Sequence, residues 1–273
     1  MDYIDYDEKL AGTKLATEHR ELQNQVLALR AKLNQRPEEM VLRVPVEKRP
    51  SIGHPTSRIS VGGLYSTNRS EAFSTLRVRP ALHGLEDQSY GYSPDLSIRV
   101  ADTELAYGLN NKQLDVRNIE LVEVRSISPS RPMIRTVSTL FGLGREYLDQ
   151  CTPNGDSCHR SRFRFAGGLS VNPLGPSHLF YFLGGADIGY VSDATVGWNA
   201  GPTLIAGHRW EISDKVQWVT SISWLRRFGF YPMTDKKLES SLQWNLSQEF
   251  AFRANLQSIN SFWWTGLETH FYF

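Results

Sequence analysis

The chain has 273 residues, a net charge of +1 at pH 7 and a heavy aromatic load of 7 Trp, 11 Tyr and 13 Phe. Because acidic and basic residues nearly balance, there is no broad basic surface to attract nucleic acid, and nucleic-acid binding is not expected. No window approaches the roughly 20 apolar residues that a membrane-spanning helix needs, which excludes a helical membrane protein.

The first 36 residues predict a helix. Residues 7–36 contain no Pro and many good helix formers. Two interleaved series of mostly apolar residues repeat every seven positions. One series is Leu15, Leu22 and Leu29, and the other is His19, Val26 and Leu33. This seam favours a short coiled coil that joins copies of the chain. A single amphipathic helix lying on the rest of the protein is the open alternative. Residues 37–56, which hold four prolines, predict a linker.

Two segments resemble a known family. They are "RPSIGHPTSRISVGG" and "LRVRPALHGLEDQSYGYSPDLSIRV", and the matching positions are Gly53, His54, Arg58, Arg79, Pro80, His83, Asp87, Gly91 and Tyr92. The pattern resembles the barrel region that follows the papain-like domain in the Lnb N-terminal periplasmic domain family of Gram-negative bacteria. The resemblance implies an outer-membrane barrel. The papain-like domain is absent from this chain, so any cysteine-nucleophile chemistry of the family is not transferred to it.

From residue 57 onward the sequence alternates with a period of two. Twelve strands are expected, at 57–67, 71–80, 94–106, 113–125, 132–146, 159–171, 178–190, 197–210, 215–227, 236–247, 249–258 and 261–273. Most are near the 9 to 11 residues of a tilted membrane-spanning strand. Apolar and polar faces alternate over successive strands, which is typical of a transmembrane barrel. We therefore predict an all-β fold, an antiparallel up-and-down barrel of about 12 strands over 57–273. A soluble β-sandwich binding module is the alternative.

The alternation also assigns charged residues to the inside of the barrel. These lumen-facing residues are Arg162, Arg164, Glu239, Arg253 and Glu268. Twelve strands enclose a narrower interior than porins of 16 to 18 strands, so crossing ion pairs could close it. A closed or narrow barrel is expected, and an open conduit for small solutes or lipid is the alternative.

An even strand number places both ends of the barrel on one side, which we expect to be the periplasm. The N-terminal helix would then lie in the periplasm. A group of four polar residues, His54, Arg58, His83 and Asp87, falls on the periplasmic rim. Such a group could bind an anionic headgroup, a glycan or a neighbouring domain. Alternatively, it is a hydrogen-bonded cluster that fixes the long connection after the second strand.

Cys151 and Cys158 bracket the loop "CTPNGDSC" on the opposite, outer side. They predict a disulfide and an oxidising compartment, with free thiols or metal binding as less favoured alternatives. A lipid hydrolase would need a Ser, a His and an orienting polar residue near the outer rim, and no Gly-x-Ser-x-Gly elbow is present. No phosphate loop or ligand-spaced carboxylate set appears, so we expect no enzymatic activity and no cofactor.

The final segment, "TGLETHFYF", reads as the closing strand. Thr265, Gly266, Phe271 and Phe273 match the C-terminal signal by which outer-membrane barrels are recognised, so the barrel-insertion machinery is an expected partner. Together these patterns predict a non-enzymatic bacterial outer-membrane barrel. Its expected partners are outer-membrane lipids, further copies of the chain with lipid enclosed between them, and a periplasmic domain or protein.

Overall fold

The structure is a computed structural model, and it describes residues 21, 24–29, 53–88, 91–130, 136–149, 157–192, 197–229 and 232–273. The chain divides into two compact units, Met1–Val44 and Pro45–Phe273. In the first unit, residues 21 and 24–29 are helical and exposed. The rest of the helix predicted over 1–36, and most of the linker predicted over 37–56, lie outside the described residues. Among the helices of the described ranges, none is long and apolar enough to cross a membrane.

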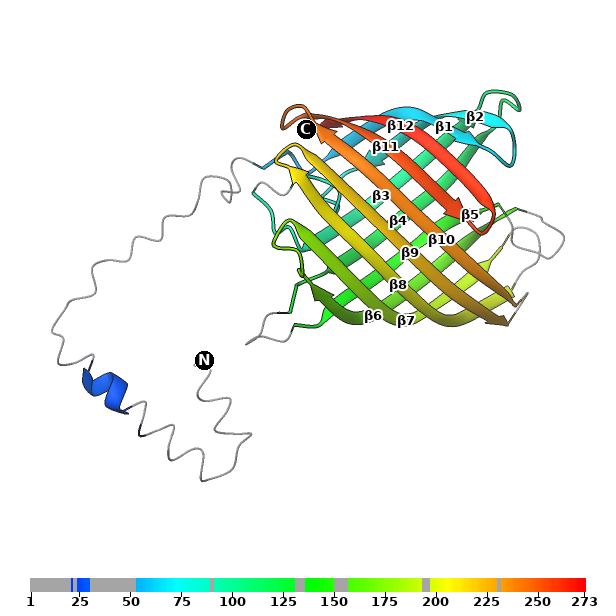
Figure 1. The fold of residues 1–273 in the computed structure, drawn as a ribbon. Helices are drawn as coiled ribbons and strands as arrows, with labels where there is room; N and C mark the ends of the chain where they lie inside the picture. The colour runs from blue at the N-terminus through cyan, green and yellow to red at the C-terminus, as the bar shows by residue number, and fades with distance from the viewer. Residues whose placement is uncertain are drawn as a thin grey trace. The chain divides into compact units, whose positions relative to one another are not determined.

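The second unit is a barrel of antiparallel strands, each paired with its neighbours in sequence (Figure 1). The strands are β1 (Arg58–Ser66), β2 (Glu71–Arg79), β3 (Leu96–Gly108), β4 (Leu114–Ser126), β5 (Ser138–Leu148), β6 (Cys158–Val171), β7 (His178–Val191), β8 (Gly197–Ser213), β9 (Val216–Gly229), β10 (Met233–Asn245), β11 (Phe250–Ile259) and β12 (Phe262–Tyr272). β1 pairs with both β2 and β12, so the sheet closes on itself. Closure confirms the predicted twelve-stranded barrel and excludes the β-sandwich.

The period of two in the sequence produces two faces with different chemistry. In β1, Arg58, Ser60 and Ser66 are buried, whereas Val61 and Tyr65 are exposed. Large apolar side chains stand on the outer face of most strands, among them Phe141, Phe165, Phe182, Leu204, Trp218, Ile222, Leu242, Trp244, Leu267 and Phe271. The outside of the barrel is therefore apolar and the inside polar, which is the reverse of a soluble protein.

Two details of the strands differ from the sequence expectation. The fifth strand begins at Ser138, six residues later than predicted. Two residues before it, Thr136 Oγ1 donates to the Ser128 carbonyl at 2.7 Å. In β3, Ala101 has a φ of 52°, which interrupts the alternation and lets both Arg99 and Asp102 face inward. A strict period of two cannot foresee that interruption.

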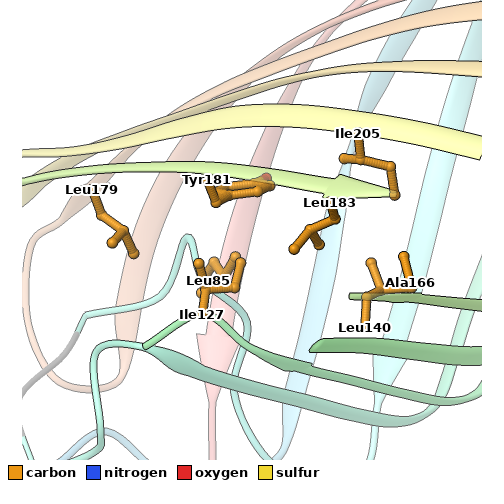
Figure 2. Close-up of a cluster of buried hydrophobic side chains, with 8 residues drawn as sticks. All are labelled: Leu85, Ile127, Leu140, Ala166, Leu179, Tyr181, Leu183 and Ile205. Atoms are coloured by element: carbon orange, nitrogen blue, oxygen red, sulfur yellow. The ribbon is translucent and has the colours of Figure 1, made fainter. Parts of the chain in front are cut away.

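Among the described residues of the barrel, two clusters of buried apolar side chains have four or more members. At the end opposite Phe273, Leu64, Phe73, Ala106 and Trp264 pack together. Figure 2 shows the other cluster, which consists of Leu85, Ile127, Leu140, Ala166, Leu179, Tyr181, Leu183 and Ile205. Leu85 belongs to the connection between β2 and β3, whereas most of the others stand on the barrel wall. That connection therefore folds into the barrel.

Candidate functional site

The connection between β2 and β3, residues 80–95, is here called the inner loop, and it contains a tight turn at its deepest point. The Asp87 amide donates to the Gly84 carbonyl at 3.1 Å, and the Gly84 amide donates back to Asp87 Oδ2 at 2.6 Å. A Cβ on Gly84 would lie 2.6 Å from a carboxylate oxygen of Glu86. The absence of a side chain at Gly84 therefore leaves room for the Glu86 carboxylate beside the turn that carries Leu85, Glu86 and Asp87.

Asp87 is the main anchor of the inner loop. Its carboxylate forms ion pairs with Arg58 at 3.1 Å, Arg79 at 2.5 Å and Arg253 at 3.3 Å. It also accepts a hydrogen bond from the Tyr272 hydroxyl at 2.8 Å. These partners stand on β1, β2, β11 and β12, so one buried carboxylate links the strands at which the barrel closes.

The neighbouring residues extend this anchorage across the barrel mouth. Glu86 forms ion pairs with Arg99 at 2.7 Å on β3 and with Arg253 at 3.2 Å on β11. The Leu85 carbonyl accepts a hydrogen bond from Gln217 Nε2 at 2.5 Å on β9. The inner loop therefore contacts opposite walls of the barrel and lies across the mouth at which β1 begins and β12 ends.

Charge keeps both carboxylates ionised. Burial alone would raise the pKa of Asp87, but Arg79, Arg58 and Arg253 outweigh burial and hold that pKa well below its usual range. Burial opposes the ionised form of Glu86 as well, and Arg99 and Arg253 lower the pKa of that carboxyl below its ordinary value. The ion pairs are therefore intact at neutral pH.

The structure brings together all four residues of the predicted rim group. The ring of Tyr92 lies between His54 and His83, with ring centroids 4.9 Å and 4.6 Å away, and the Tyr92 hydroxyl donates to the His54 carbonyl at 2.7 Å. Burial lowers the pKa of both histidines, with Asp87 opposing it.

The rim group is not an exposed surface patch. His54, Arg58, His83 and Asp87 are all buried, and Arg58 and Asp87 bind each other rather than solvent. An external headgroup or glycan therefore has no free access to it. The geometry is that of the alternative interpretation, a cluster that fixes the long connection after the second strand.

Above the inner loop lies a cavity of about 210 Å³ that is lined mainly by charged side chains. All five predicted lumen-facing residues, Arg162, Arg164, Glu239, Arg253 and Glu268, line it. Ion pairs run along its wall: Arg162 and Arg164 on β6 bind Glu120 at 2.8 Å and Glu123 at 3.0 Å on β4, and Lys237 binds Glu239 at 2.8 Å within β10. Opposite charges thus reduce the free space inside the barrel.

The far end of the interior is narrowed by Trp264. Its indole Nε1 donates to Asp149 Oδ2 at 3.1 Å, and the guanidinium carbon of Arg117 lies 3.7 Å from a Trp264 ring centroid. Arg69, in the β1–β2 turn, binds Asp149 at 3.0 Å. The cavity therefore lies between the inner loop at one end and this tryptophan at the other.

A serine, a histidine and a glutamate, Ser60, His270 and Glu268, also contact one another in a buried row. Ser60 Oγ lies 2.5 Å from His270 Nδ1, and His270 Nε2 lies 3.5 Å from a Glu268 carboxylate oxygen. However, Ser60 and His270 are at most 1% exposed and do not line the cavity, so a substrate cannot reach the hydroxyl. Among the residues with described positions, no cluster of three His, Cys, Asp or Glu side chains is arranged to hold a metal ion.

Residues 47–272 match a family model described as a domain of unknown function, DUF7840. The chain belongs to this family. Among curated proteins, none matches the chain.

Solved structures similar to the DUF7840 barrel include the NanC porin, with a TM-score of 0.47, 8% identity, and coverage of 78% of this chain and 98% of that one. The KdgM porin has a TM-score of 0.45 and 8% identity, and the match covers 79% of this chain and 99% of that porin. The COG4313 outer membrane channel from Pseudomonas putida F1 has a TM-score of 0.45 and 10% identity, and the match covers 84% of this chain and 99% of that channel.

Several predicted features of the DUF7840 chain stay predictions. Cys158 is buried at the start of β6, but Cys151 lies outside the described residues, so the disulfide is not settled. Phe271 and Phe273 are exposed on the outer face and Gly266 faces inward, and the insertion signal of Thr265, Gly266, Phe271 and Phe273 stays a prediction. In the helical seam, Val26 and Leu29 are exposed, and Leu15, His19, Leu22 and Leu33 lie outside the described residues.

Sequence reasoning missed Tyr272, which binds Asp87, and the neighbouring pair of Glu86 and Arg99. These three residues carry no motif that separates them from other charged or aromatic residues of the chain. One signal was available, because the connection from 81 to 93 is too long for a simple turn and contains Leu-Glu-Asp next to glycine. An apolar residue followed by two acids in a long connection between inward-facing arginines indicates a loop that folds inside.

Proposed function

We propose that this DUF7840 protein is a bacterial outer-membrane barrel that is closed at rest by its inner loop. The observation that carries the proposal is the anchorage of Asp87, a fully buried carboxylate bound by three arginines and a tyrosine from four strands. A connection that merely joined β2 to β3 would need no such set of partners. The loop lies across one mouth and charged side chains paired along the wall narrow the interior, so free passage of solutes is not expected at rest.

Support for a membrane location comes from the outer face. Trp218, Ile222, Leu267 and similar side chains are exposed on strands, where burial in lipid would remove them from water. Closure of the sheet leaves no strand edge in hydrocarbon, which is a condition for spanning a bilayer. The even strand number supports a periplasmic position for both termini and for the inner loop.

Two measurements test this proposal. The folded barrel should migrate faster than the boiled chain on a cold denaturing gel, as closed membrane barrels do. In planar bilayers the protein should show no steady single-channel steps. Steady conductance of the unaltered protein would overturn the closed state, and absence of a heat-dependent shift would overturn the membrane barrel.

A conduit for small solutes is the second candidate, and the cavity of about 210 Å³ favours it. A barrel with no transport role could fill its interior with apolar side chains, as small barrels do. In this function the inner loop is a plug that leaves the mouth under a condition or with a partner in the periplasm. Deletion of residues 84–87 should then produce steps that the unaltered protein lacks.

The N-terminal seam supports a proposal about assembly. Val26 and Leu29 are 57% and 62% exposed on a helix, and such apolar positions pair readily with a second helix. Homo-oligomers would hold lipid between their barrels. Leu22→Asp with Val26→Asp should reduce the mass in mild detergent to that of a monomer, whereas Ala28→Asp, off the seam, should not. An unaltered protein that stays monomeric at high concentration would overturn the proposal.

A further inference from the structure

The wall behind Asp87 is a row of hydrogen-bond donors. Arg58 stands directly opposite Arg79 on one side and opposite Tyr272 on the other in the strand register. Like charges directly opposite each other on neighbouring strands are destabilising. This placement is therefore stable only if an anion sits in front of the row, and the anion present is the carboxylate of Asp87.

The positive charge of this wall exceeds what the inner loop supplies. Four guanidinium groups, those of Arg58, Arg79, Arg99 and Arg253, share the two carboxylates of Glu86 and Asp87. Within the described part of the chain, their one further ion pair is Arg99 with Glu123 at 3.7 Å. These four arginines are here called the arginine wall.

The arginine wall also has unused donors. The Nε atoms of Arg58, Arg79 and Arg99, and the Nη2 atoms of Arg58 and Arg79, are buried and have no hydrogen-bond partner in the protein. Arg58 and Arg79 are themselves 0% exposed. Guanidinium groups with free donors in a fixed arrangement suit the oxygens of a carboxylate or phosphate, which accept two parallel bonds from each fork.

We propose that the arginine wall is a binding site for a small soluble anion, carrying a carboxylate or phosphate group, whose place Glu86 and Asp87 occupy when the inner loop is docked. The proposal rests on the closed barrel proposed above and names the ligand class of its interior. Arg99 and Arg253 also line the cavity, so an anion bound at the wall would extend into that space. The cavity is smaller than the roughly 300–1,000 Å³ typical of drug-sized ligands, which limits the anion to a small one.

The test removes the competing loop charges and supplies a free anion. The full-length variant Glu86→Gln/Asp87→Asn keeps the loop but leaves the arginine wall uncompensated. Its thermal unfolding in detergent is followed by the heat-dependent gel shift, with millimolar inorganic phosphate or chloride at matched ionic strength. We expect phosphate to raise the unfolding temperature of this variant by several degrees and to leave the unaltered protein unchanged, because its own carboxylates fill the site.

Two further variants make the result specific. Adding Arg79→Gln to the loop variant should abolish the phosphate effect. Glu120→Gln should not acquire one, because Arg162 keeps Glu146 as a partner at 2.5 Å. An equal effect of phosphate on Glu120→Gln, or no effect on the loop variant, would overturn the proposal. If the double variant does not fold, Asp87→Asn alone is measured in the same way.

Conductance separates this inference from the proposed function. In a salt gradient, any steps of the loop variant should reverse at a potential that indicates preference for chloride over potassium. Cation-selective steps would refute the arginine wall as an anion site and leave the plugged barrel intact. Steady conductance of the unaltered protein would refute the closed state, whereas the phosphate measurement would still decide the anion site.

Discussion

Replacing Asp87 by Asn should release the inner loop, because it removes the charge shared by three buried arginines. Asp87 is 2% exposed, and its partners Arg58, Arg79 and Arg253 are 0%, 0% and 3% exposed. Removing one partner of a buried ion pair costs roughly 3–5 kcal/mol, since the remaining charge is left uncompensated in a poorly solvated place. Asparagine retains the size and some hydrogen bonds of the carboxylate. The substitution therefore loses little packing, and the cost of about 3–5 kcal/mol needs no added term for a cavity.

That free energy sets the change in the equilibrium between the docked and the undocked inner loop. With each 1.4 kcal/mol equal to a factor of ten, the ratio of docked to undocked loop should fall by about two to nearly four orders of magnitude. The assay is single-channel recording in planar bilayers, with open probability as the readout. Asp87→Asn should show frequent openings where the unaltered protein shows none.

A matched control is available in β3. Asp102 is also buried and forms two hydrogen bonds of 2.7 Å with Arg77, and no hydrogen bond or ion pair joins it to the described residues of the inner loop. Asp102→Asn should therefore destabilise the barrel and leave the mouth closed. If Asp87→Asn opens no more often than Asp102→Asn, the inner loop is not held by Asp87 and the reasoning is refuted.

Three further changes should have measurable effects. Gly84→Ala places a methyl group 2.6 Å from a Glu86 carboxylate oxygen, so it should displace that carboxylate and raise the open probability, by less than Asp87→Asn does. Acidification from about pH 7.5 to about pH 5 should also open the mouth. The pKa values of His54 and His83 are below the ordinary 6.5, so the stability they give to the docked loop is complete above pH 6.5 and is lost as pH falls through their lowered values. Leu267→Arg, at a position 71% exposed on the outer face, should cost about 2–4 kcal/mol in a bilayer and reduce the folded fraction on a cold gel.

Each of these changes has a counterpart that should be nearly silent. Gly63→Ala adds a Cβ whose nearest neighbour, the Phe73 carbonyl, is 3.6 Å away, so it should leave the mouth closed. His54→Gln with His83→Gln should flatten the pH dependence between about pH 7.5 and about pH 5, since Asp87 stays ionised there. Leu174→Arg, in the β6–β7 turn and 67% exposed, should fold normally. An equal loss of folding for both arginine variants would show that the outer face does not contact lipid.

The barrel was predictable because the alternation of apolar and polar residues that defines each strand is a local feature of the sequence. The series Val216, Trp218, Thr220, Ile222 and Trp224 faces outward in β9 as alternation predicts, and eleven of the twelve strand starts lie within three residues of the expected positions. The same alternation placed Arg162, Arg164, Glu239, Arg253 and Glu268 on the inside. The late start of the fifth strand and the positive φ of Ala101 were not predictable, since such local departures depend on neighbouring segments.

By itself the sequence determined the strand number, the apolar outside, the charged inside and the unusual length of the connection after β2. Each of these follows from side-chain order along the chain, which a period of two converts into faces. The inward fold of the inner loop was decided only in the tertiary structure. Asp87 contacts Arg253, 166 residues away in sequence, and a shared anion can be recognised only once closure has placed four arginines of β1, β2, β3 and β11 around it.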